Sequence, residues 1–95
     1  MQIELHLDYF EEDDSIVALC PELQVSSFGD TVEDAEKSIM EALDLFLEGC
    51  EALGTINEVL EESGFHKVDD RWVYRKPIKT VKTTMQRVTG AAFHA

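Results

Sequence analysis

Residues 29–54 read GDTVEDAEKSIMEALDLFLEGCEALG, and this stretch decides the fold. Its apolar residues recur at spacings of three and four, which predicts one long amphipathic helix. The apolar stripe consists of Val32, Ala35, Ile39, Leu43, Phe46, Cys50 and Leu53. Thr31 is a good N-cap residue, and Gly54 is typical of the position just after a helix. Leu45 and Leu47 fall outside the stripe, so we expect the helix to be apolar on more than one side.

The sequence on either side of this helix predicts four β-strands. Residues 2–10 alternate between apolar and polar, residues 15–20 form a more apolar strand, and residues 23–28 suggest a third. Residues 55–64 predict a short second helix, and residues 71–75 predict the fourth strand. We therefore expect an α+β fold of order β-β-β-α-α-β. In it, one face of a three-stranded antiparallel meander plus the fourth strand is covered by the long helix.

Charge is divided unevenly along the 95 residues. The formal net charge is −12, yet all 20 acidic residues lie at or before Asp70, and residues 71–95 hold six basic residues and no acidic one. We expect one domain over residues 1–76 and a basic tail over residues 77–95. Because the body is acidic, we do not expect its surface as a whole to bind nucleic acid or an anionic membrane. No apolar run approaches the ~18 residues of a membrane span, and we see no signal-peptide pattern, so the cytoplasm is the expected location.

Residues that could support catalysis or metal binding form no recognisable motif. Residues 11–14 are an acidic turn without the glycine of a calcium loop, although Asp8 with Asp44 stays open as a carboxylate pair for metal. His6 lies on the polar face of the first strand and belongs to no nucleophile motif. The two cysteines lack zinc spacing and are expected to be reduced. We therefore expect no catalytic residue, no metal and no cofactor.

Three segments together resemble the HicB-like antitoxin family. They read ALCPEL over residues 18–23, GDTVEDA over residues 29–35 and EALDLFL over residues 41–47. The resemblance covers residues 3–53 and implies a partial ribonuclease-H-like or double-stranded-RNA-binding-like layer without the nuclease's catalytic carboxylates. It also implies a homodimer or larger homo-oligomer that neutralises a small basic RNA-cleaving toxin of the HicA kind. Many members add a DNA-binding module, which the residues after Tyr74 do not resemble, so the similarity is to a stand-alone or short branch.

Charge and resemblance together predict an interaction protein that binds a basic partner through its acidic surface. One alternative is a transcriptional regulator whose basic tail contacts nucleic acid, and the least favoured is a ribonuclease-H-like enzyme. The expected partner contacts are acidic residues near the first strand and on the long helix, namely Glu4, Asp8, Glu11, Glu41, Asp44 and Glu48. The excess apolar surface of the helix predicts a homodimer or larger assembly, with the tail lying against the acidic body of its own or a neighbouring copy.

Five motif residues are expected to have structural roles. Cys20 is a small core residue, and Pro21 ends its strand because proline cannot donate to a β-ladder. Gly29 is expected to supply a backbone conformation that other residues dislike. Asp30 and Thr31 are expected to accept hydrogen bonds from the free N–H groups at the start of the helix.

Overall fold

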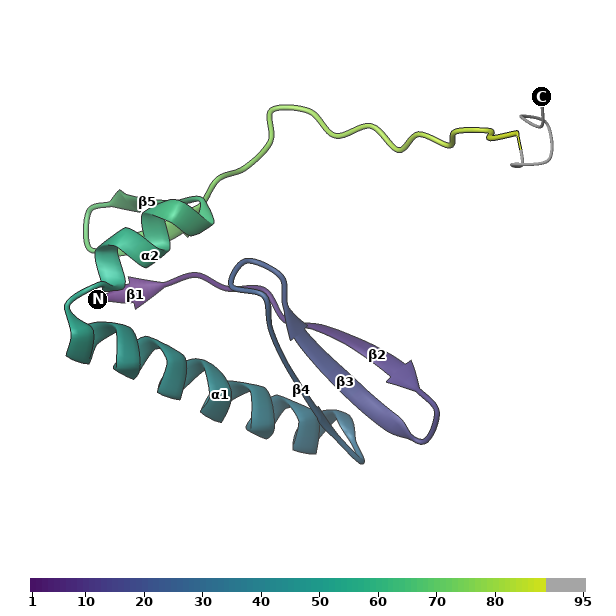
Figure 1. The fold of residues 1–95 in the computed structure, drawn as a ribbon, viewed down its shortest axis with the longest axis horizontal. Coiled ribbons are helices and arrows are strands. Elements are labelled where there is room, and N and C mark those ends of the chain that lie inside the picture. The colour runs from purple at the N-terminus through teal and green to yellow at the C-terminus, as the bar shows by residue number, and fades with distance from the viewer. Residues whose placement is uncertain (89–95) are drawn as a thin grey trace, which may run out of the picture.

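The computed structural model describes residues 1–88, and it confirms the predicted α+β fold (Figure 1). The last part of the predicted tail, residues 89–95, lies outside the described residues. The elements in chain order are β1 (Gln2–Ile3), β2 (Asp8–Glu12), β3 (Ser15–Cys20), β4 (Val25–Gly29), α1 (Val32–Leu53), α2 (Ile56–Ser63), β5 (Phe65–Val68) and β6 (Arg71–Tyr74). They form two sheets of three strands each, in the orders β2-β3-β4 and β1-β6-β5. No helix in the described part of the chain is both long and apolar enough to cross a membrane.

The predicted strand over residues 2–10 is divided between the two sheets. Its first part, β1, pairs in parallel with β6, whereas β2 pairs antiparallel with β3. Side chains still alternate in burial across the break, because Leu5 and Leu7 are half-buried and His6 is exposed. The change of partner therefore alters the hydrogen bonding of this segment without altering which side chains face inward. β5, which pairs antiparallel with β6, is an additional strand that the sequence pattern did not predict.

Helix α1 packs along β3 and β4 (Figure 1). The side chains between them form the centre of a single core. The helix begins at Thr31, whose Oγ1 accepts a hydrogen bond from the Asp34 N–H at 3.1 Å. It ends before Gly54, which has a left-handed φ of 71°. The core residues are Ala18, Cys20, Leu23, Ala35, Ile39, Leu43, Leu60, Phe65 and Trp72. The second sheet and α2 thus extend the same core rather than forming another.

Gly29 lies where the first turn of α1 passes closest to the sheet. A Cβ atom at this position would lie 2.6 Å from the Ala35 backbone nitrogen and 2.7 Å from the Asp34 Cβ. Gly29 is not among the residues with positive φ, so the conformational reason expected from the sequence was wrong. The position requires glycine because a side chain would not fit against α1.

The remaining motif residues lie around the same end of the sheet. Cys20 is fully buried and is the last residue of β3, and the exposed Pro21 opens the turn that follows. Among the hydrogen bonds of residues 1–88, none reaches the Asp30 carboxylate. The side-chain cap of α1 is therefore made by Thr31, not shared with Asp30 as expected.

Apolar side chains stay exposed on two surfaces of the body. The first is α1, whose residues Met40, Leu45 and Leu53 face solvent. The second is the outer face of the β2-β3-β4 sheet, where Phe10, Val17 and Phe28 are direct cross-strand neighbours. The helix surface is the excess apolar area that the sequence indicated, and the sheet adds a second apolar row in which Phe10 and Phe28 are exposed and Val17 is half-buried.

The chain after β6 forms neither helix nor strand within residues 75–88. It runs away from the body, and all of its described side chains are exposed (Figure 1). The expected packing of the tail against the acidic body of its own copy is therefore not what the structure shows.

Candidate functional site

An open groove of about 730 Å³ runs between α1 and the first five residues of the chain. We call it the acidic groove. Its floor is apolar and consists of Met1, Ile3, Leu5, Met40, Leu43 and Leu47. Three of these residues belong to the N-terminal segment and three to α1. The N-terminal residues are alternate positions of that segment, so they lie on the same side of it and face the helix. The groove exists because β1 pairs with β6 rather than with β3, which places the N-terminal segment beside α1.

Acidic side chains follow one edge of this groove along α1. Glu41, Asp44, Glu48 and Glu51 lie at spacings of three, four and three, so they share one helix face, and all four are exposed. We call these four residues the acidic rim. Lys37 is the one basic side chain among the described residues that line the groove. The structure therefore brings together three of the six residues predicted as partner contacts, Glu41, Asp44 and Glu48, and adds Glu51.

The other three predicted contact residues do not line the groove. The carboxylate of Glu4 accepts a hydrogen bond from Arg71 Nη1 at 2.8 Å, and both side chains are about half exposed. Asp8 and Glu11 are exposed on β2, the edge strand of the other sheet. Glu4, Asp8 and Glu11 thus lie outside the groove, whereas Glu41, Asp44 and Glu48 line it beside an apolar floor that a partner could fill.

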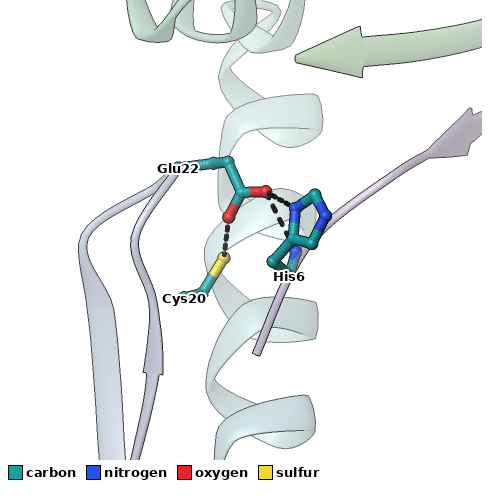
Figure 2. A network of polar contacts seen from close by, with 3 residues as sticks. All are labelled: His6, Cys20 and Glu22. Atoms are coloured by element: carbon teal, nitrogen blue, oxygen red, sulfur yellow. Dashed lines mark hydrogen bonds and ion pairs between the residues drawn. The ribbon is translucent and has the colours of Figure 1, made fainter. Parts of the chain in front are cut away.

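A buried carboxylate outside the acidic groove was missed by the sequence analysis (Figure 2). Glu22 has a side chain only 4% exposed, and its Oε2 accepts a hydrogen bond from the His6 backbone N–H at 3.0 Å. The same oxygen lies 2.5 Å from His6 Nδ1, and Oε1 accepts a hydrogen bond from the Cys20 thiol at 3.7 Å. These contacts fasten the segment between β1 and β2 to the turn after β3.

The electrostatics of this network favour a structural role. The hydrogen bond that His6 donates to the Glu22 carboxylate, followed by attraction to its negative charge, raises the pKa of His6 above its usual 6.5. Burial raises the pKa of the Cys20 thiol, so the sulfur stays protonated at neutral pH. A cysteine nucleophile needs a thiolate that a substrate can reach, and Cys20 is fully buried. The network can hold the wall of the groove in place, but it is not arranged for nucleophilic attack.

Metal binding was the other chemistry left open for the acidic residues. Within residues 1–88, no group of three or more His, Cys, Asp or Glu side chains is arranged to hold a metal ion. Asp44 lines the acidic groove, whereas Asp8 lies on β2 and does not line it. The acidic turn at Asp13 and Asp14 is an exposed hairpin connection between β2 and β3.

Comparison with known proteins adds no relative to this description. No protein-family model, no curated protein and no solved structure matches the chain.

Proposed function

We propose that this chain is an interaction protein of the HicB-like antitoxin kind, which binds and neutralises a small basic RNA-cleaving toxin in the cytoplasm. The observation that carries the proposal is the acidic groove, where an apolar floor lies beside four exposed carboxylates. A basic protein that places an apolar side chain between α1 and β1 brings its own cations against the acidic rim. This combination of an apolar centre and a charged edge is typical of protein interfaces.

The charge of the body supports fast capture of such a partner. Residues 1–70 contain all 20 acidic residues and only Lys37 and Lys67 as basic ones, so their formal charge is −18. A field of this kind accelerates association with an oppositely charged protein by about 10–10³-fold at low salt. The rate of association should therefore fall steeply as salt is added, while dissociation changes less.

The proposal expects a small basic protein to be encoded beside this chain, and the test uses that protein as the toxin. Expressed alone in a bacterial host, it should arrest growth and cleave RNA, and co-expression of the present chain should restore growth. The groove variant Glu41→Gln/Asp44→Asn/Glu48→Gln should weaken binding by about tenfold or more, because each carboxylate loses its charge at the interface. A neighbour that does not arrest growth, or arrest that co-expression does not relieve, would contradict the proposal.

A matched control separates local contacts from the total charge. The variant Glu12→Gln/Asp13→Asn/Asp14→Asn removes the same three charges from the exposed turn between β2 and β3. It should slow association slightly and leave dissociation unchanged, because charges that lie far from an interface act mainly by steering the approach of the partner. Equal effects of the two variants on dissociation would show that the groove is not the contact surface.

A regulator that contacts nucleic acid through the tail is the second candidate. The exposed cations Lys79, Lys82 and Arg87 support it. Three phosphate contacts give a slope of about −2.7 in a plot of log affinity against log salt. A steeper slope, or nanomolar binding to one operator sequence that disappears when the three cations are replaced, would favour the regulator over the antitoxin.

A further inference from the structure

We propose that, in the free protein, the acidic groove holds residues 77–88 of a second copy of this chain, so that two copies exchange their basic tails. The groove is then a self-association site as well as the proposed toxin site. If the groove also binds a toxin, the tail and the toxin compete for it, and this competition rests on the function proposed above. The exchange of tails between two copies does not depend on that function.

The first observation is that the tail carries apolar side chains for which its own copy offers no contact. Ile78 is fully exposed, and Val81, Met85 and Val88 are each about two-thirds exposed or more. Their spacings of three, four and three place them on one face if the segment becomes helical. A segment with such a face stays extended alone and gains its structure by burying that face against a partner.

The second observation is a match of length between tail and groove. The groove-lining part of α1 runs from Lys37 to Glu51 and is about 21 Å long at 1.5 Å per residue. A helix over residues 77–88 would be about 17 Å long. The tail therefore spans most of the groove, and its apolar face can lie on Met40, Leu43 and Leu47.

The third observation is complementary charge. The tail contains Lys79, Lys82 and Arg87 and no acidic residue. The groove presents the four carboxylates of the acidic rim against the single cation Lys37. Apolar contact along the floor and ion pairs along the rim thus come from the same two segments, which is the pattern by which an amphipathic helix binds in a groove.

The path of the chain favours a second copy over the same copy. β1 and β6 are parallel, so β6 ends near Leu5, and the tail leaves at that end of the groove. Entering its own groove would require a sharp reversal at Lys76 and Pro77. A proline disfavours helical backbone at the residue before it, which favours an extended conformation at Lys76. The tail continues away from the body, as Figure 1 shows, and a two-fold exchange then satisfies both grooves at once.

A charge-swap experiment on the full chain tests the exchange without any toxin. The groove reversal Asp44→Lys/Glu48→Lys and the tail reversal Lys79→Glu/Lys82→Glu should each weaken self-association by about tenfold or more in sedimentation velocity. Combining both reversals should restore most of the affinity, because the signs are complementary again. The control Glu12→Lys/Asp14→Lys makes the same charge change at the exposed turn and should behave like the unmodified chain. Circular dichroism checks that every variant is folded.

A photocrosslink identifies the copy and the surface. Benzoylphenylalanine replaces Met85, and the chain is mixed with an isotopically heavy preparation before irradiation. We expect heavy-to-light crosslinks to residues 37–51. The exchange would be overturned by crosslinks confined to one copy or by crosslinks to another surface. It would also be overturned by a monomer at micromolar concentration, or by a combined charge reversal that does not restore self-association. Because no toxin is present, these results do not depend on whether the antitoxin proposal is correct.

Discussion

Replacing Gly29 with alanine should push apart the two elements whose contact forms the centre of the core. The added Cβ would lie 2.6 Å from the Ala35 nitrogen and 2.7 Å from the Asp34 Cβ. Ordinary contacts between carbon atoms need about 3.5–4.0 Å, so α1 and β4 must separate by close to 1 Å. The atoms in the way belong to the backbone and to a Cβ, and neither can rotate aside.

The loss of stability should be large because these atoms cannot move out of the way of the added Cβ. Overpacking of a core typically costs about 1–3 kcal/mol, and we expect the upper end, about 3 kcal/mol, because the backbone itself must move. A domain of residues 1–76 has a free energy of unfolding of about 4–11 kcal/mol at 0.05–0.15 kcal/mol per residue. The melting temperature should accordingly fall by about 12–24 °C.

The assay is urea unfolding at one fixed protein concentration, followed by circular dichroism and by the fluorescence of the buried Trp72. The matched control is Gly49→Ala, since Gly49 lies in α1 with nothing within 4 Å of the added Cβ. This control should stabilise the protein by about 0.5–1 kcal/mol, because alanine is the better helix former. A loss below about 1 kcal/mol for Gly29→Ala would refute the close approach of α1 to β4.

Three further predictions concern the cap, the buried carboxylate and the assembly. Thr31→Ala removes the acceptor for the Asp34 N–H and should cost about 1 kcal/mol in the same urea titration; an unchanged midpoint would contradict the cap. Because Glu22 raises the pKa of His6 above 6.5, the stability that this pair adds is complete below pH 6.5 and is lost as the pH rises through the raised pKa. His6→Gln should remove this pH dependence from thermal melts, and an identical slope in variant and parent would disprove the linkage. Light scattering at micromolar concentration should give a particle of at least twice 10.8 kDa, and a monomer would show that the exposed apolar faces stay uncovered.

Local patterns predicted the elements well where a single period dominates. Four residues of the predicted stripe on α1, Ala35, Ile39, Leu43 and Cys50, lie inside as expected, because spacing alone sets a helix face. The other three, Val32, Phe46 and Leu53, are exposed, so the prediction was wrong for them. The alternation over residues 2–10 likewise predicted which side chains face inward. Neither period carries information about the neighbouring strand, so the division of that segment between β3 and β6 was not predictable.

The candidate site was predictable only in part for the same reason. The acidic residues on α1 were found from charge, but their importance depends on Ile3 and Leu5 lying opposite them, which follows from the β1–β6 pairing. Glu22 gave no signal, since an acidic residue after proline in a turn is normally exposed. β5 was missed because His66 and Lys67 interrupt the apolar pattern of a strand only four residues long.

The β1–β6 pairing joins the first and the last strand of the chain, so it can form only at the end of synthesis on the ribosome. The β2-β3-β4 meander and α1 are finished at Leu53, whereas β6 begins at Arg71. At about 5–20 residues per second, this leaves about 1–4 s in which the nascent chain has its helix but no partner for β1. During this interval the N-terminal segment cannot form the second wall of the acidic groove. We therefore expect a ligand that needs both walls of the groove to bind only chains whose translation has passed Trp72, and truncated products should not compete for it.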